Sequence, residues 1–289
     1  MITRLYVDNF KSLVNFELKL TELTLLLGPN GVGKTSVLDV MHALRQLLAG
    51  IANVPDKDKP GTSVVFETST LTRWQQRTQQ VIELDAKIVG ADYRYRLEIE
   101  HDPKNRRARI MLETLTLSGQ PLFRFEYGEV QLYRDNHSPG PRFGGDWSAS
   151  ALARVPPRGD NTHLTRFLEF MRKVIVCGLY PPTFAAESSA EDAVLQRDAR
   201  NFAAWYRHLL LERQDLVPEF TEALQGVIPG FRNIPMEKVG LDTRALMVMF
   251  DQFDHKYELR LDEISDGQRA LIALYALVKL AAGQGYTLF

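Results

Sequence analysis

Residues 28–35, Gly-Pro-Asn-Gly-Val-Gly-Lys-Thr, have the types and the spacing that hold the phosphates of a nucleotide. They fit the pattern G-x-x-x-x-G-K-[ST] at every position. Glycines in such a loop let the backbone curl until successive N–H groups point inward at the phosphates. In this arrangement Lys34 bridges the outer phosphates and the Thr35 hydroxyl holds Mg²⁺. The loop therefore predicts ATP as the ligand and Mg²⁺ as the metal.

The segments on either side of this loop match what the chemistry requires. Residues 23–27 form an apolar run that predicts a strand leading into the loop, and residues 36–44 carry apolar side chains at helical spacing. A helix that begins there adds partial positive charge at its N-terminus. The competing interpretation, a glycine turn with an incidental lysine, does not account for this order of strand, loop and helix.

A second motif lies far downstream, at residues 264–269, directly before the apolar helical run 271–280. Taken alone, Ser265 and Gln268 predict a helix capping box, in which the serine caps an N–H group and the glutamine reaches back. Gly267 supports another interpretation, because the missing side chain lets a phosphate approach the backbone at the helix start. The residues themselves leave both interpretations open.

These motifs together resemble the ABC-type ATPase heads of the SMC, RecF and OLD-like AAA-family ATPases without a coiled coil. Residues 264–269, Ile-Ser-Asp-Gly-Gln-Arg, are similar to the ABC signature, usually written L-S-G-G-Q, with Ile264 for Leu and Asp266 for the first Gly. Residues 9–13, Asn-Phe-Lys-Ser-Leu, followed by the phosphate loop, resemble the start of such heads. The resemblance implies an α/β P-loop fold.

The resemblance also implies a site shared between two protomers. Each head would present its signature to the ATP held by the phosphate loop of the other, so that ATP joins a homodimer and hydrolysis separates it. Nucleotide-binding residues implied in this way are Lys11, Ser12, Asn30, Gly31, Val32, Gly33, Lys34, Thr35 and Ser36, with Thr35 at Mg²⁺. Signature residues acting in trans are Ser265, Asp266, Gly267 and Gln268.

The catalytic residues are not identified by the sequence. In the resembled family an apolar strand after the signature helix ends in Asp-Glu, where Asp supports Mg²⁺ and Glu polarises the attacking water. Residues 286–289 look like the start of that strand, which predicts a truncated head with inefficient hydrolysis. The pair at 262–263 precedes the signature and is rejected. The glutamine that contacts Mg²⁺ also stays open, with these candidates: Gln75, Gln76, Gln79 and Gln80.

The division of the chain follows from the same resemblance. Residues 1–50 and 230–289 are expected to form the nucleotide-binding core, and residues 51–229 an inserted antiparallel β meander and helical lobe. Alternating residues place the meander at 81–133, and helical periodicity marks 164–171 and 191–212. Strand-like runs are expected at 245–250 and 257–261, and a long loop at 136–160.

The bulk properties exclude several classes of protein. The chain has 289 residues, a net charge of −1 and one cysteine, Cys177, so neither a disulfide framework nor a global pull toward nucleic acid is expected. No apolar run approaches the roughly 20 residues of a membrane span. A cytoplasmic location without a membrane partner is therefore the expectation.

DNA contact would have to come from a local patch. The turn at residues 102–109 carries four basic residues, Lys104, Arg106, Arg107 and Arg109, and is either a solvated turn or a contact to the phosphate backbone. The leading functional interpretation is an ATPase head acting in DNA repair or phage defence, with a nuclease partner or domain as a further candidate. The alternatives are the nucleotide-binding subunit of an ABC transporter and a non-catalytic, ATP-gated scaffold.

Overall fold

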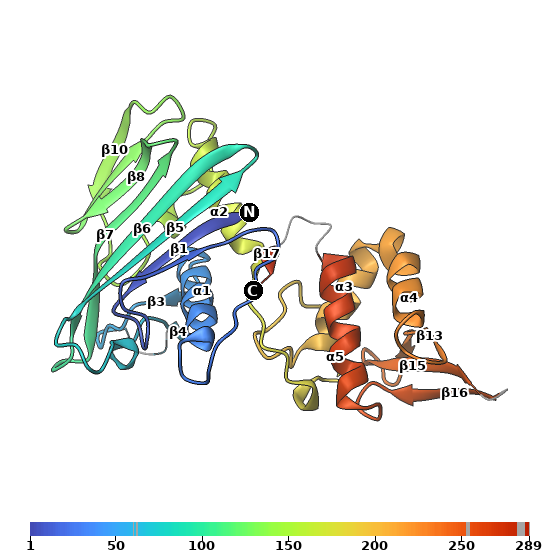
Figure 1. The fold of residues 1–289 in the computed structure, drawn as a ribbon. Coiled ribbons are helices and arrows are strands. Elements are labelled where there is room, and N and C mark those ends of the chain that lie inside the picture. The colour runs from blue at the N-terminus through green and yellow to red at the C-terminus, as the bar shows by residue number, and fades with distance from the viewer. Residues whose placement is uncertain (60, 62, 253–254, 282–286, 289) are drawn as a thin grey trace. The chain divides into compact units, whose positions relative to one another are not determined.

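A computed structural model describes the chain except residues 60, 62, 253–254, 282–286 and 289. The described residues form two compact units, unit 1 (Met1–Val174) and unit 2 (Ile175–Phe289). Figure 1 shows the two units as a large sheet with helices, and a smaller group of helices and short strands. Each unit is described separately below.

Unit 1 is built on an eight-stranded sheet in the order β10-β9-β8-β7-β6-β5-β1-β2. Every neighbouring pair is antiparallel, and from β5 to β10 each strand pairs with the one that follows it in sequence. The strands are β1 (Ile2–Asp8), β2 (Phe16–Lys19), β5 (Gln79–Ile88), β6 (Ala91–Asp102), β7 (Arg107–Leu117), β8 (Gln120–Glu126), β9 (Glu129–Tyr133) and β10 (Pro139–Gly144). The meander predicted at 81–133 is confirmed.

Alternation along the strands decides which face of this sheet is buried. In β6, Tyr93 and Tyr95 are buried, whereas Arg94 between them is exposed. Phe167 of α2 (Thr162–Arg172) stacks on both tyrosines, with ring centroids 5.9 Å apart in each pair. The helix α1 (Lys34–Leu48) contacts α2. Short elements complete the unit: β3 (Ala52–Asn53), β4 (Ser63–Val64), η1 (Thr68–Thr70) and η2 (Leu152–Arg154).

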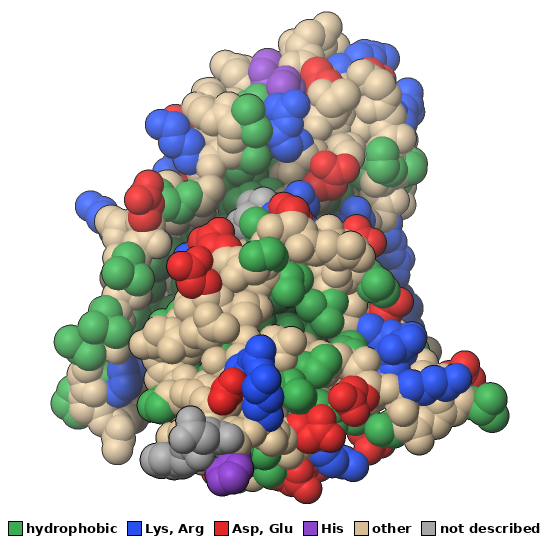
Figure 2. Space-filling model, turned by 90° about the vertical axis from the view of Figure 1, so that its right-hand side faces the viewer, with side chains coloured by type: hydrophobic (Ala, Val, Ile, Leu, Met, Phe, Trp, Pro, Cys, Tyr) green, Lys and Arg blue, Asp and Glu red, His purple; other side chains and the backbone are tan. Residues whose placement is uncertain are grey.

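The opposite face of the sheet carries charged pairs across neighbouring strands. Arg4 of β1 lies 2.8 Å from Glu83 of β5, and Arg94 of β6 lies 2.8 Å from Asp85 of β5. Arg94 is the more exposed of the two arginines, and ion pairs at such exposed positions contribute little to stability. Figure 2 shows one side of the molecule, on which acidic and basic side chains lie among hydrophobic ones.

Unit 2 is centred on the strand β15, which pairs antiparallel with four short strands. Its core includes the aromatic side chains of Phe184, Phe202, Tyr206 and Phe220, which pack in series. The elements are β11 (Val174–Ile175), η3 (Pro181–Thr183), β12 (Glu187–Ser188), α3 (Phe202–Glu212), η4 (Gln214–Leu216), α4 (Val217–Gln225), β13 (Phe231–Asn233), β14 (Met236–Lys238), β15 (Arg244–Gln252), β16 (His255–Arg260), α5 (Asp266–Tyr275), η5 (Ala276–Ala281) and β17 (Thr287–Leu288).

The strand predicted at residues 23–27 is wrong. These residues lie between β2 and the phosphate loop without strand assignment, and Leu23, Leu25 and Leu27 are 90%, 76% and 81% exposed. A strand exists through hydrogen bonds to a neighbour, and β1 is already paired on both sides, with β2 and with β5. Within the described residues, no strand is paired with this apolar segment.

The helix predicted at residues 191–212 is only half formed, because α3 begins at Phe202. The residue before it, Asn201, forms hydrogen bonds to the segment that precedes the helix. Its Nδ2 donates to Asp192 Oδ2 at 2.6 Å and to the Val194 carbonyl at 2.8 Å. Its Oδ1 accepts from the Gln196 N–H at 2.9 Å. These local bonds hold the chain in an irregular conformation that competes with helix.

Other boundaries shift by smaller amounts. The loop expected at 136–160 contains β10, and the polar segment 73–80 is irregular until Gln79 begins β5. The strand runs expected at 245–250 and 257–261 correspond to β15 and β16, while Asp254 of the turn between them lies outside the described residues. The fold is thus a mixed α/β structure with antiparallel sheets and several helices, and the division into a core and an insert stays a prediction.

Candidate nucleotide-binding site

The phosphate loop of unit 1 ends in a helix start that its own side chains do not cap. Gly31 and Gly33 have φ angles of 86° and 103°, in the left-handed region that favours glycine. Gly33 is the N-cap of α1 and makes no side-chain capping bond. Because the first N–H groups of a helix have no partner within the helix, they are available to an anion.

The Lys34 side chain folds back over this loop. Its Nζ donates to the carbonyl oxygens of Gly28 and Pro29, at 2.7 Å each. Both bonds are exposed, and both acceptors belong to the loop itself. The ammonium group is therefore held beside the uncapped start of α1, where an arriving phosphate would replace the two carbonyls as its partner.

The segment at residues 9–13 packs against the same helix start. Ser12 Oγ lies 3.4 Å from Ser36 Oγ, and a Cβ atom added to Gly33 would lie only 2.7 Å from Ser12 Oγ. Lys11 Nζ forms an ion pair with Asp39 Oδ2 at 2.5 Å. The structure thus brings Lys11 and Ser12 to the first turns of α1, with the Lys11 ammonium engaged by the helix.

The remaining predicted residues of the loop differ in exposure. Asn30, Gly31, Val32 and Thr35 are exposed, whereas Ser36 is buried beside Ser12. In the described part of the chain, no group of three or more His, Cys, Asp or Glu side chains could hold a metal ion. Thr35 follows Lys34 in the first turn of α1, and its side chain is exposed.

The signature residues of unit 2 form a complete capping box at the start of α5. Ser265 Oγ accepts from the Gln268 N–H at 3.3 Å, and Gln268 Oε1 accepts from the Ser265 N–H at 3.1 Å. Ser265, Asp266 and Gly267 are nevertheless exposed, and a Cβ atom on Gly267 would have no neighbour within 4 Å. Helix capping and an open approach to the backbone are therefore both present.

The carboxylate of Asp266 has a basic partner one turn along the helix. Asp266 Oδ1 accepts from Arg269 Nη2 at 2.5 Å, and Arg269 Nη1 donates to the Pro181 carbonyl at 3.0 Å. This pairing offsets the negative charge that the departure from the usual signature introduces at the helix start. Asp266 also lies where the helix dipole favours an acidic residue.

A scan against protein families finds one model that spans both motifs. It is described as "AAA domain, putative AbiEii toxin, Type IV TA system" and matches residues 23–289. The chain belongs to this AAA-domain family. No curated protein matches the chain.

Membership of this AAA-domain family, a family of P-loop ATPases, indicates ATP binding and ATPase activity, with the use of Mg²⁺ that usually accompanies them. The match begins at residue 23, so residues 9–13 lie outside it although they pack against the phosphate loop. Among the described residues, no helix combines the length and the apolar character needed to cross a bilayer.

The glutamine candidates of this AAA-domain protein occupy different environments. Gln80 is fully buried, and its Nε2 donates to the Asn9 carbonyl at 2.9 Å. Gln79 Nε2 donates to Glu98 Oε2 at 2.9 Å, and Gln75 Oε1 accepts from Arg77. Gln76 is exposed. In this conformation the Gln80 side chain is buried and bonded to Asn9, so it does not face a metal site. Which of the other three glutamines would contact Mg²⁺ stays open.

The basic turn between β6 and β7 is only partly available to a ligand. Arg107 Nη2 lies 3.4 Å from Asp56 and also pairs with Asp58. Arg109 lies over the Trp147 ring, with its guanidinium carbon 5.6 Å from the centroid. The side chains of Lys104 and Arg106 at the tip are also exposed, and Lys104 interacts with the Asp102 carboxylate beside it.

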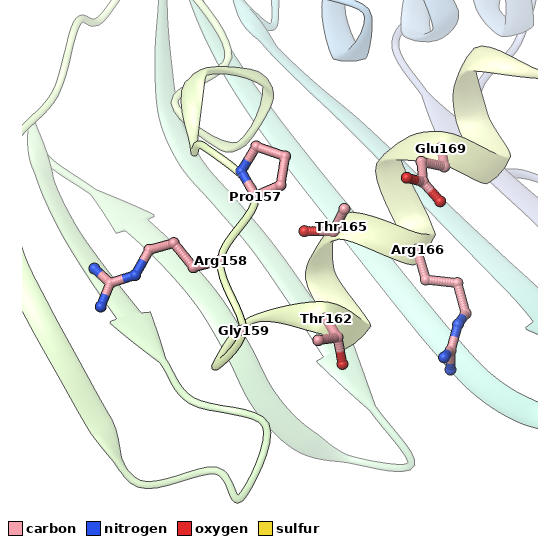
Figure 3. A pocket seen from close by; sticks show the side chains of 7 residues that line it. All are labelled: Pro157, Arg158, Gly159, Thr162, Thr165, Arg166 and Glu169. Carbon is pink, nitrogen blue, oxygen red and sulfur yellow. The ribbon is translucent and has the colours of Figure 1, made fainter.

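A pocket of about 460 Å³ lies at the start of α2, away from the phosphate loop in sequence. The backbone N–H groups of Thr162 and His163 already donate to the Asp135 carboxylate, at 2.9 and 3.0 Å. Figure 3 shows the guanidinium groups of Arg158 and Arg166 pointing away from one another. The helix start is occupied and the two cations do not converge, so this pocket does not form an anion site.

Proposed function

We propose that the chain is an ATP-binding head of the SMC, RecF and OLD-like type, that the full-length protein hydrolyses ATP, and that it pairs with a second copy when ATP is bound. The observation that carries the ATP site is the position of Lys34, whose ammonium lies over a glycine loop at the uncapped start of α1. The family match supports the same chemistry over both motifs. A role in DNA repair or phage defence is part of this proposal.

In this proposal, each residue of the phosphate loop makes a different contact with ATP. The N–H groups at the start of α1 bind phosphate oxygens, and Lys34 exchanges the Gly28 and Pro29 carbonyls for the outer phosphates. Thr35 would hold Mg²⁺ together with those phosphates, and the metal would neutralise charge that develops during phosphoryl transfer. Ser12 supports the loop from the opposite side at Gly33.

Titration with a fluorescent ATP analogue tests the ATP site directly. The chain should bind the analogue saturably in the presence of Mg²⁺, and unlabelled ATP should displace it. Removal of Mg²⁺ with a chelator should weaken the binding, because Thr35 would hold the metal and the metal would neutralise charge on the phosphates. Absence of saturable binding at millimolar nucleotide would rule out the proposed site.

ATP-dependent pairing is supported by the exposure of the signature. Ser265 and Gly267 stand at the N-terminus of a ten-residue helix, α5, with open space above Gly267. A phosphate presented by a second copy could therefore meet the helix start and the Ser265 hydroxyl. Binding of one ATP by two heads would make the nucleotide part of the interface.

The substitution Gly267→Arg should prevent this pairing. With Mg²⁺ and a non-hydrolysable ATP analogue, the full-length wild-type protein should shift toward dimer in analytical ultracentrifugation, and its Gly267→Arg variant should stay monomeric. The physical reason is that a bulky side chain at the helix start blocks the approach of the phosphate. Nucleotide binding by the monomer should be unchanged, since the phosphate loop is untouched.

The substitution Gly226→Arg provides the matched control. Gly226 is an exposed C-cap residue of α4 in the same unit, so the variant gains the same side chain and charge at the end of another helix and not at the start of α5. It should dimerise as the wild type does. Dimerisation of the Gly267→Arg variant, or loss of pairing in the control, would contradict a shared site at the signature.

DNA contact is proposed at the exposed basic side chains of the turn between β6 and β7. Replacing Lys104 and Arg106 by alanine should weaken DNA binding and flatten its dependence on salt by about two units of log–log slope, because two phosphate contacts are lost. Replacing Lys19 and Lys87, two exposed lysines of the same unit, changes the net charge equally and should leave the slope unaltered. Equal slopes in both double variants would exclude the turn as a DNA contact.

A further inference from the structure

Asn9, at the end of β1, is fully buried and adopts a left-handed conformation with a φ of 63°. Both the nitrogen and the oxygen of its side-chain amide form hydrogen bonds. Nδ2 donates to the carbonyls of Arg77 and Gln79, at 2.9 and 2.8 Å, and Oδ1 accepts from the Thr72 N–H at 3.2 Å. Asparagine is one of the few residues with a side chain that adopts this conformation readily.

The chain that follows Asn9 forms a closed turn against the phosphate loop. The N–H of Phe10 donates to the Leu13 carbonyl at 3.0 Å, and the N–H of Leu13 donates to the Phe10 carbonyl at 2.8 Å. Phe10 and Leu13 are each 2% exposed and anchor the turn in the core. Ser12, between these anchors, is the residue that meets Gly33 and Ser36.

A second layer of buried side chains holds Asn9 in place. Gln80 Nε2 donates to the Asn9 carbonyl at 2.9 Å and to Thr70 Oγ1 at 3.1 Å, while the Gln80 Oε1 lies 2.9 Å from His101 Nε2. Burial lowers the pKa of His101 to about 4, so its ring is neutral at pH 7. A neutral ring with its proton on Nε2 donates to Gln80 and fixes the orientation of that amide.

We infer that Asn9 is a positioning residue for the phosphate loop. It fixes the turn at residues 10–13, and through Ser12 this turn sets where Gly33 and the first turn of α1 lie. Asn9 touches neither nucleotide nor metal, and it acts only through the backbone that it orients. The inference rests on the proposed ATP site, because a positioned phosphate loop has a function only if phosphate binds there.

The test compares two variants of Asn9 with a matched buried asparagine. Asn9→Gly keeps the left-handed backbone accessible and removes the amide, whereas Asn9→Ala also adds backbone strain. Asn161, in the same unit, is 6% exposed and hydrogen-bonds to Pro156 and Arg158. The control Asn161→Ala should therefore lose thermal stability, while the hydrogen bonds that it removes are made to residues 156–165 and not to the phosphate loop.

Both Asn9 variants should bind the fluorescent ATP analogue about tenfold more weakly than the wild type, because a misplaced site loses binding geometry. In ligand-free protein, hydrogen exchange of residues 28–36 should become faster in Asn9→Gly and stay unchanged in Asn161→Ala. If Asn9→Gly does not fold, Gln80→Ala removes one contact to Asn9 and should give the same two results.

Two outcomes would overturn the inference. One is wild-type affinity and exchange in a folded Asn9→Gly or Gln80→Ala variant, and the other is an equal loss of affinity in Asn161→Ala. Failure of the ATP site itself is separate, since then the wild type would not bind the analogue at all. The exchange measurement needs no nucleotide and reports on loop positioning in either case.

Discussion

Replacing Lys34 by alanine should reduce ATP affinity at least about a hundredfold, since hydrogen bonds between charged groups are the strong ones and the ammonium meets the outer phosphates. The fold should be unchanged, because the bonds of Lys34 Nζ to other described residues go only to the exposed carbonyls of Gly28 and Pro29. Loss of these two contacts releases an exposed loop and leaves the core intact. Titration with the fluorescent ATP analogue measures the affinity, and thermal unfolding measures the stability.

The matched control for this prediction is Lys87→Ala. Lys87 is an exposed lysine of β5 in the same unit, so its replacement removes the same charge far from the phosphate loop in sequence. Its affinity for ATP should equal that of the wild type. If Lys34→Ala binds the analogue as tightly as this control does, the loop does not hold phosphate and the assignment of residues 28–35 is wrong.

Local patterns predicted those parts of the fold that neighbouring residues determine. Alternation predicted the meander because each of its strands pairs with the next one along the chain. The helix after the phosphate loop was predicted for the same reason, since apolar residues such as Val37, Val40 and Leu44 recur on one buried face. Both elements depend on short-range spacing, which a single sequence displays.

Two predicted elements were wrong because they depend on a neighbouring strand or on the hydrogen bonds of one side chain. The apolar run at 23–27 has strand composition, yet composition does not supply a neighbouring strand with free hydrogen-bonding groups. The helix expected from residue 191 begins at Phe202 because the Asn201 side-chain amide forms hydrogen bonds to the residues before it. Hydrophobic periodicity does not reveal hydrogen bonds that depend on a single side chain.

In the candidate site, too, the sequence predicted the contiguous motifs and did not predict the contacts between residues far apart in the chain. The glycine loop and the capping box are contiguous motifs, so the sequence located both. The buried contacts of Asn9 join residues 63 to 71 positions away, and nothing in the sequence indicated that Gln80 would face Asn9 and not a metal. The pairing of Asp266 with Arg269 lies within one helical turn and could have been found from its spacing.

Gly33→Ala should be the most damaging small substitution in the phosphate loop. At a φ of 103°, a side chain is strained, and the new Cβ would lie 2.7 Å from Ser12 Oγ and 2.9 Å from Leu13 Cδ2. Leu13 is 2% exposed and packed in the core, so it has little room to move. Left-handed strain and overpacking together should cost about 2–4 kcal/mol of unfolding free energy.

ATP affinity should fall as well, because relief of the clash moves the loop and the first turn of α1 away from Ser12. Gly31→Ala is the matched control: its φ of 86° imposes similar strain, but its Cβ would meet no atom within 4 Å. That variant should lose only the part due to strain, about 1–2 kcal/mol. Urea unfolding of both variants, with ATP titration of each, separates the two causes. Equal losses of unfolding free energy at the two positions would show that the contact with Ser12 and Leu13 does not shape the loop. A larger loss at Gly33, partly restored when Ser12→Gly is added to Gly33→Ala, would show that it does.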